Sequence, residues 1–274
     1  MPFESYDISS QTVLITGATS GIGQASAYAF AELGCKVIIC GRRVERLNQT
    51  KANIEAQFSE AKVLAYPLDV TDSEACTSMP QSLQDNHPDF SEVDILVNNA
   101  GLAVGKSGAH EANMSDVQAM IATNVTGLIT MSTTFLPQMH ERRRGHLINV
   151  SSIAAHDMYP GGSTYNATKS AVTAYTYATR MDLVGTPIRV TAISPGMVET
   201  EFSIVRWKGD EAKAASTYDN IVVLKPEDVA DNIIYSATRP LRVAIADIIV
   251  YPTNQGSGNG PTVKAGKSLG ALEK

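Results

Sequence analysis

Cysteine, histidine and basic charge are scarce in this sequence, and each shortage excludes a class of protein. The three cysteines, Cys35, Cys40 and Cys76, form no CxxC pair, which excludes a disulfide framework and is typical of a reducing compartment such as the cytoplasm. The five histidines have no HxxxH or Cys/His spacing, so we expect no metal site. The 22 Lys and Arg against 28 Asp and Glu give a net charge of −6, which offers nothing to a nucleic-acid partner.

Charged residues are also missing from two helical stretches. Residues 117–140 contain no Asp, Glu, Lys or Arg, but nine of them are Asn, Gln, Ser or Thr, too many polar groups for a membrane span. Residues 159–179 contain a single charged side chain, Lys169. Because a helix without charge on any face is buried on both sides, we predict that both stretches pair across a twofold axis in a homo-oligomer.

The chain has 274 residues, of which 43% are hydrophobic, enough to bury a full core. Only about ten residues precede the first hydrophobic strand, which leaves no room for a signal peptide. We predict a single domain over 1–254, with an insertion at about 199–220. The segment 255–274 is rich in Gly and Lys without apolar periodicity and is expected to be a mobile tail.

Short β-branched runs alternate with longer helical patterns, which predicts an α/β fold with a doubly wound, seven-stranded parallel sheet between helices. The strands are expected at 12–16, 36–40, 63–67, 95–98, 146–151, 189–193 and 247–251. The helices are expected at 23–33, from about 44, and at 73–85, 115–143, 163–184 and 226–237. The basic run 142–144 then ends a helix, where its positive charges interact favourably with the negative end of the helix dipole. We favour this interpretation over a nucleic-acid-binding patch.

A glycine-rich turn, T-G-A-T-S-G-I-G at 16–23, follows the first predicted strand. Glycines let the backbone turn sharply and approach a pyrophosphate, which the N–H groups of the next helix can bind. Glycines also cluster in ordinary turns, but the position within a strand–helix–strand unit predicts a dinucleotide site. Its expected contacts are Gly17, Thr19, Ser20, Gly21, Ile22 and Gly23.

The end of the second predicted strand decides which dinucleotide fits. NAD enzymes place a carboxylate there, about 20 residues past the glycines, to bind the ribose 2′-hydroxyl. This sequence instead has Arg42 and Arg43, whose guanidinium groups can bind a 2′-phosphate. Two solvated arginines are the alternative, but cations are disfavoured at a helix N-terminus without an anion, so we expect NADP(H). Asp69, after the third strand, either accepts from the adenine amino group or caps a helix.

Tyr165 and Lys169 stand four residues apart, so on a helix they share a face. That spacing also arises by chance, but Lys169 is the only charge between Asp157 and Arg180, and a lone lysine in an uncharged helix needs an explanation. A nearby cation lowers the pKa of a tyrosine from about 10, so that Tyr165 can exchange a proton while a hydride moves. Ser152, at a strand end, is placed to hold the substrate oxygen.

Six motifs in order resemble the short-chain dehydrogenase/reductase family: TGATSGIG, NNAG at 98–101, a helix with Asn124, NVSS at 149–152, YNATK at 165–169 and PGMVET at 195–200. The resemblance spans about 12–253 and implies a Rossmann-type fold. It implies Tyr165 as acid and base, Ser152 as partner of the substrate oxygen, Lys169 as ribose anchor, and Asn124 as holder of a relay water. It also implies cofactor contacts at Val70, Asn99, Pro195, Gly196, Val198 and Thr200.

Within the family, the GRR at 41–43, the stretch 195–210 and YPTNQ at 251–255 resemble NADP-dependent 3-hydroxy acid dehydrogenases. This resemblance implies a tetramer that oxidises serine, allo-threonine and related short acids such as 3-hydroxyisobutyrate. One departure is Ala154-Ala155, where the subgroup has Ala-Gly, and the extra methyl could narrow the pocket. A carboxylate substrate needs a cation; Arg206 and Lys208 are the candidates, with surface charges on a solvated lid as the alternative.

Two other functions fit the same residues. The first is NADPH-dependent carbonyl reduction of bulkier ketones or aldehydes. The second is redox sensing by a regulator that binds a dinucleotide without turnover. The intact set of Ser152, Tyr165 and Lys169 argues against the regulator, since a sensor needs no proton donor.

Overall fold

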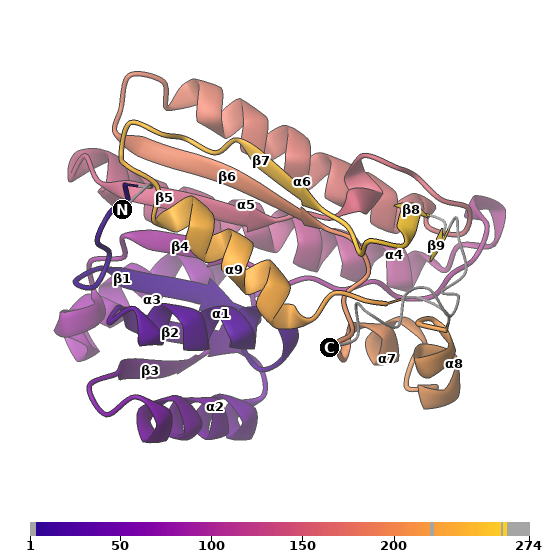
Figure 1. Ribbon diagram of the computed structural model, residues 1–274, viewed down its shortest axis with the longest axis horizontal. Coiled ribbons are helices and arrows are strands. Elements are labelled where there is room, and N and C mark those ends of the chain that lie inside the picture. The colour runs from indigo at the N-terminus through magenta and orange to yellow at the C-terminus, as the bar shows by residue number, and fades with distance from the viewer. Residues whose placement is uncertain (1–3, 220–221, 259, 262–274) are drawn as a thin grey trace.

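A parallel sheet forms the middle layer of the molecule, with helices on both faces (Figure 1). The structure is a computed structural model and describes residues 4–219, 222–258 and 260–261. The strands of the sheet are β1 (Thr12–Thr16), β2 (Lys36–Gly41), β3 (Lys62–Pro67), β4 (Ile95–Asn98), β5 (Gly145–Val150), β6 (Ile188–Pro195) and β7 (Asp247–Val250). Their order is β3-β2-β1-β4-β5-β6-β7, and each neighbouring pair is parallel.

Strand side chains alternate between two hydrophobic clusters, one on each face of the sheet. Val13 and Ile15 of β1 join the cluster with α1 (Gly21–Glu32), α2 (Val44–Gln57) and α9 (Pro226–Ala237), whereas Leu14 joins the other. The second cluster includes α3 (Ser73–Asn86) and α5 (Leu128–Glu141). A hydrogen bond from Asn149 Nδ2 to Thr176 Oγ1 (2.9 Å) ties β5 to α6 (Ser163–Asp182). Strands buried on both faces confirm the predicted doubly wound fold.

All seven predicted strands are present, each within two residues of its expected bounds. The helix expected over 115–143 is instead α4 (Met114–Ile121), a π-helical turn (Ala122–Gly127) and α5. Two helices that no periodicity revealed, α7 (Phe202–Arg206) and α8 (Glu211–Ser216), occupy the predicted insertion.

The expected mobile tail does not begin at residue 255. Strand β8 (Gln255–Ser257) pairs with β9 (Gly260–Pro261), and the side chain of Gln255 accepts a hydrogen bond from Met197 N at 2.8 Å. This bond holds the chain at 255 against the segment that follows β6, which a composition argument cannot detect. Residues 262–274, the rest of the expected tail, lie outside the described residues.

The segment Met114–Glu141 is long and apolar enough to cross a membrane by length and composition, and its most apolar 18 residues have a mean hydropathy of 1.3. In the structure 39% of those 18 residues are buried, and polar groups tie the segment to the sheet. One such contact runs from Asn98 Nδ2 of β4 to Ser132 Oγ, at 2.9 Å. The segment therefore covers one face of the sheet, and the predicted subunit contact along it stays a prediction.

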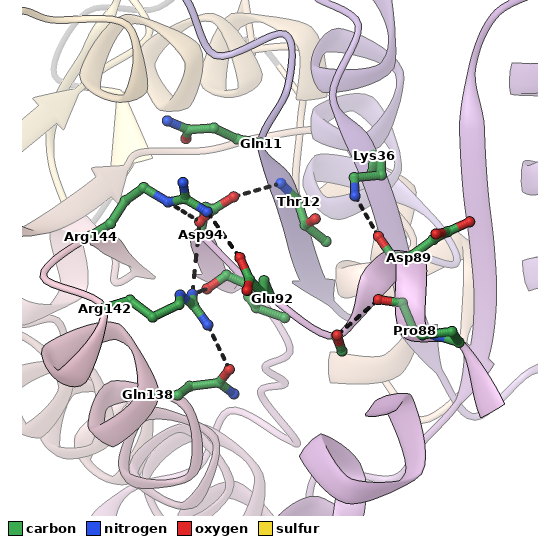
Figure 2. Close-up of polar contacts among 12 residues, drawn as sticks. Gln11, Thr12, Lys36, Pro88, Asp89, Glu92, Asp94, Gln138, Arg142 and Arg144 are labelled. Carbon is green, nitrogen blue, oxygen red and sulfur yellow. Dashed lines mark hydrogen bonds and ion pairs between the residues drawn. The ribbon is translucent and has the colours of Figure 1, made fainter. Parts of the chain in front are cut away.

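A buried carboxylate ties the chain together at the amino ends of β1 and β4 (Figure 2). Asp94 is 3% exposed and accepts hydrogen bonds from Thr12 N (3.0 Å) and Arg144 Nε (2.7 Å). Arg142 Nη2 lies 3.7 Å from the same carboxylate, and Arg144 also pairs with Glu92 at 3.3 Å. The basic run thus ends α5, as predicted, and two of its arginines form ion pairs within the chain.

Candidate active site

A cavity of about 740 Å³ lies at the carboxyl ends of the strands. It opens beyond β1 and β4, where the strand order changes direction and doubly wound sheets bind their ligands. The predicted site residues that line it are Gly17, Thr19, Ser20, Gly21, Ile22, Arg42, Arg43, Asp69, Val70, Asn99, Ser152, Tyr165, Lys169, Pro195, Gly196, Val198, Thr200 and Arg206. Gly23 and Asn124 are not part of its lining.

The turn after β1 packs so closely that only glycine fits at its end. A Cβ atom on Gly23 would lie 2.4 Å from Asn99 Nδ2 and 2.6 Å from the carbonyl oxygen of Gly17. Gly17 (φ +67°) and Gly21 (φ +57°) adopt the left-handed backbone that favours glycine. Ser20 at the N-cap of α1 accepts no hydrogen bond from the helix, so the first N–H groups can bind an anion in the cavity.

Arg43 is held against the glycine-rich turn. Its Nε and Nη2 donate to Thr19 Oγ1 (3.2 and 2.7 Å), and Nη2 also donates to Ser20 Oγ (3.0 Å). Its Nη1 donates to a carboxylate oxygen of Glu201 at 2.7 Å. The sequence predicts that a cofactor phosphate compensates the charge of Arg43. In the structure a carboxylate from a distant part of the chain compensates that charge.

Asp69 follows β3 and lines the cavity beside Arg42, whose Nη1 lies 3.6 Å from Asp69 Oδ2. Partial burial raises the pKa of Asp69, but hydrogen bonds from Thr71 and the charge of Arg42 outweigh it, so the pKa lies below its ordinary value. The N-cap of α3 is Asp72, which accepts from Ala75 N at 3.0 Å. The alternative that Asp69 caps the helix is therefore wrong.

Tyr165 and Lys169 share a face of α6, as their spacing predicts. The Nζ atom of Lys169 lies 5.9 Å from the centroid of the Tyr165 ring and donates a hydrogen bond to the Val150 carbonyl oxygen at 2.8 Å. Ser152 lies just beyond β5, is 9% exposed and accepts from Ala154 N at 3.1 Å. The three predicted catalytic side chains thus meet where β5 ends and α6 begins.

The pKa values of this group differ from the sequence-based expectation. Burial raises the pKa of Tyr165, and nearby Tyr159 adds to the rise, while the hydrogen bond with Ser152 and the charge of Arg206 oppose it. Burial lowers the pKa of Lys169 to about 8. The expected lowering of the Tyr165 pKa is wrong for the chain alone, because desolvation of the phenol outweighs the nearby cations.

Asn124 stands beside Lys169 but behind the cavity wall. It is 1% exposed, its Oδ1 accepts from Leu102 N (2.8 Å), and its Nδ2 donates to Leu102 O (2.8 Å) and Thr168 Oγ1 (3.1 Å). A Cβ atom on Gly101 would lie 3.4 Å from both Asn124 Oδ1 and Lys169 Nζ. Glycine at this position therefore keeps a small space open between the amide and the ammonium group.

Three cations that line the cavity, Lys106, Lys169 and Arg206, have no carboxylate partner among the described residues. Arg206, at the end of α7, donates to the hydroxyl of Tyr159, and its guanidinium lies 5.6 Å from the Tyr165 ring centroid. Its Nε atom is buried without a hydrogen-bond partner. Lys208, the other candidate, pairs with Asp116 at 2.8 Å and does not line the cavity. Of the two candidates from the sequence, Arg206 is therefore the one that is placed to meet an anionic substrate in the cavity.

Sequence reasoning missed several lining residues that come from loops. The ring centroid of Tyr159 lies 5.9 Å from Lys106 Nζ and 5.3 Å from the guanidinium carbon of Arg206. Glu201 binds Arg43, as described above. The signals were weak: Tyr159 lies six residues before Tyr165, and Glu201 directly follows PGMVET. No spacing rule connects such residues to a site, because only the tertiary fold brings them there.

Comparisons with known proteins match most of the chain. Residues 11–210 match the family model described as short chain dehydrogenase. An NADP-dependent 3-hydroxy acid dehydrogenase of Schizosaccharomyces pombe is 40% identical over 250 residues, which cover 91% of this chain and 95% of that protein. Another, of Salmonella typhi, is 45% identical over 244 residues (89% and 95%). The solved closed form of a serine dehydrogenase complexed with NADP+ matches with a TM-score of 0.86 at 42% identity, over 93% of this chain and 100% of that chain.

Proposed function

Because the chain belongs to the short-chain dehydrogenase family, we propose that it is an NADP(H)-dependent oxidoreductase of short 3-hydroxy acids such as serine, allo-threonine and 3-hydroxyisobutyrate. The hydride moves between the nicotinamide and the carbon that bears the 3-hydroxyl. The names of the matched relatives support this activity. The observation that carries the proposal is that one cavity brings Ser152, Tyr165 and Lys169 together with Arg206, a cation that has no carboxylate partner among the described residues.

The other end of the cavity fits NADP. The glycine-rich turn leaves room for a pyrophosphate at the start of α1, and Arg42 and Arg43 bring two guanidinium groups for the 2′-phosphate. A volume of about 740 Å³ is within the usual range for cofactor and ligand sites. NADP supplies the acceptor of the hydride, and NADPH the donor in the reverse direction. The wall between the two ends would orient the nicotinamide through Asn99, Pro195, Gly196, Val198 and Thr200.

Tyr165 exchanges the proton of the substrate hydroxyl in this proposal. Its raised pKa keeps the phenol protonated, which is the form that reduction needs, since the phenol gives its proton to the substrate carbonyl oxygen. In oxidation Tyr165 accepts that proton, and the positive charges of Lys169 and Arg206 favour the resulting phenolate. Ser152 donates a hydrogen bond to the substrate oxygen and holds it toward the phenol.

Arg206 is the proposed anchor of the substrate carboxylate. A partly buried guanidinium without an anion is costly, and a carboxylate compensates it with two parallel hydrogen bonds. The bond to the Tyr159 hydroxyl fixes the guanidinium within 5.6 Å of the Tyr165 ring centroid. The proposed carboxylate anchor therefore lies beside the phenol that exchanges the proton of the substrate hydroxyl.

A substrate panel tests the proposed function. Oxidation of serine, allo-threonine and 3-hydroxyisobutyrate, and reduction of bulky hydrophobic ketones, are followed by cofactor absorbance with NADP(H) and with NAD(H). We expect saturable turnover of the acids with NADP+ and a higher kcat/KM than for the ketones. Turnover of the ketones alone would favour the carbonyl reductase. Turnover abolished in Tyr165→Phe while NADP+ still binds would exclude a sensor, which needs no proton donor.

We also propose that the enzyme is a cytoplasmic homo-oligomer, most consistent with a tetramer. Large apolar side chains stay exposed on the uncharged helical stretches, at Ile121 (45%) and Tyr177 (41%), and just beyond their ends, at Met114 (63%) and Met181 (62%). Burying them against a second copy removes apolar surface from water. The three cysteines are buried free thiols, which suits a reducing compartment. Light scattering at micromolar concentration tests the assembly, and a monomer would contradict it.

A further inference from the structure

A single glutamate joins two walls of the cavity. Glu201, between β6 and α7, accepts a hydrogen bond from Arg43 Nη1 (2.7 Å) and another from Arg46 Nη1 (2.9 Å). Arg43 lies just before α2, and Arg46 lies in its first turn. We name these three side chains the Glu201 clasp. Hydrogen bonding and charge from Arg43 hold the pKa of Glu201 below its ordinary value, so the carboxylate is ionised at neutral pH. The clasp is the contact by which the chain after β6 reaches α2.

The clasp lies at the glycine-rich turn, because its Arg43 also donates to Thr19 and Ser20. Beside it, Thr200 approaches the glycine-rich turn so closely that a Cβ atom on Gly21 would lie 3.0 Å from Thr200 Cγ2. The lining residues Arg42 and Asp69 lie at one end, and Tyr165 at the other. A dinucleotide that reaches both ends must run past this contact. Figure 1 shows α7 and α8, which continue from Glu201, as a unit beyond the carboxyl ends of the strands.

We propose that Glu201 and Arg46 are positioning residues that hold the segment after β6 closed over a bound dinucleotide and so control its release. The inference rests on the NADP site of the proposed function. Arg46 does not line the cavity, so it acts only through Glu201. The clasp side chains are 34–55% exposed, and exposed ion pairs are weak and screened by salt. A weak, solvated clasp suits a contact that must open in every catalytic cycle.

The rate of NADPH release tests the clasp. NADPH fluorescence is followed by stopped flow after displacement with excess NADP+, for wild type, Glu201→Gln, Arg46→Gln and Arg46→Lys. We expect release about three- to tenfold faster in Glu201→Gln and Arg46→Gln, and most of the slow release restored in Arg46→Lys, which keeps the charge. The matched control is Glu199→Gln, an exposed carboxylate on the same segment with no ion pair among the described residues, and it should release NADPH at the wild-type rate.

The salt dependence of NADPH release and the affinity for NADPH test the clasp further. Added salt should speed release from both proteins, because it screens the contacts between the cofactor phosphates and the arginines. The effect should be larger for wild type, which also has the ion pairs of the clasp to screen. An unchanged rate of NADPH release in both Glu201→Gln and Arg46→Gln would overturn the proposed role of the clasp. Slower release with tighter binding would also overturn it, since Glu201 would then compete with the cofactor phosphate for Arg43. A wild-type chain that binds no NADPH would refute the proposed function together with the clasp, whereas the other failures refute the clasp alone.

Discussion

The ammonium group of Lys169 donates a hydrogen bond to the backbone oxygen of Val150, 2.8 Å away, and thereby ties α6 to the last residue of β5. Lys169 is 5% exposed, and no carboxylate lies within ion-pair distance of it in the described part of the chain. The hydrogen bond fixes the position of the cation but does not compensate its charge. Burial therefore lowers the pKa of Lys169 to about 8, and the folded chain carries the cost of that charge at neutral pH.

Replacing Lys169 should raise stability while it abolishes turnover. The pKa of Lys169 falls from an ordinary value of 10.5 to about 8 on folding, so the cost is full below pH 8, declines from pH 8 to 10.5, and is absent above. We expect Lys169→Met to increase the free energy of unfolding at pH 7 by up to about 3 kcal/mol, less the cost of the unpaired Val150 oxygen. Urea unfolding of variant and wild type at pH 7 and pH 10 measures the difference in their free energies of unfolding. A difference between variant and wild type that did not shrink at pH 10 would contradict the assignment.

The space beside Gly101 should matter for proton transfer. A Cβ atom there meets Asn124 Oδ1 and Lys169 Nζ at 3.4 Å, which is ordinary contact, so Gly101→Ala fits without displacing either group. It nevertheless fills the space in which a relay water would connect them. We expect kcat to fall about 10- to 100-fold with little change in NADP+ affinity. Steady-state kinetics and cofactor titration measure the two effects, and wild-type kcat in Gly101→Ala would exclude a water at this place.

The sheet and the glycine-rich turn could be predicted because their signals are local. The strand 12–16 is a continuous β-branched run next to a turn that needs glycine at fixed positions. The spacing of Tyr165 and Lys169 likewise translates directly into one helix face. The π-helical turn at Ala122–Gly127 could not be predicted. A wide turn shifts the helical pattern by about one residue, but residues 117–140 carry no charge on any face that would reveal the shift.

The electrostatics of the site could not be predicted, because they depend on burial and on contacts between distant segments. A sequence shows that Lys169 follows Tyr165 but not how completely both are desolvated, and desolvation decides the direction of both pKa shifts. It shows two arginines after a strand but not that Glu201, 158 residues away from Arg43, compensates one of them. In both cases the structure differs from the sequence-based prediction in the charges of the site and not in where the site lies.

Arg206 should determine the affinity for the acid substrate. We expect Arg206→Met to raise the KM for serine about 10- to 100-fold, because the carboxylate loses its charged hydrogen bonds, with a smaller effect on kcat. Tyr159→Phe, which frees the guanidinium without removing it, should raise the KM less. The matched control is Lys208→Met, a cation two residues away that pairs with Asp116 outside the cavity. An unchanged KM for serine in Arg206→Met would exclude Arg206 as the anchor.

Asp94 should affect stability without affecting the site, because it lies at the amino ends of β1 and β4, whereas the cavity lies at the carboxyl ends of the strands. An amide in Asp94→Asn can still accept from Thr12 N but leaves Arg142 and Arg144 without their buried anion. Removing one partner of a buried ion pair is strongly destabilising, so we expect the free energy of unfolding to fall by about 2–4 kcal/mol, with KM values unchanged. Glu92→Gln is the matched control: its side chain is 66% exposed, and its pair with Arg144 should contribute less than about 1 kcal/mol. Equal losses in the two variants by urea unfolding would show that burial of Asp94 does not set the strength of its ion pairs.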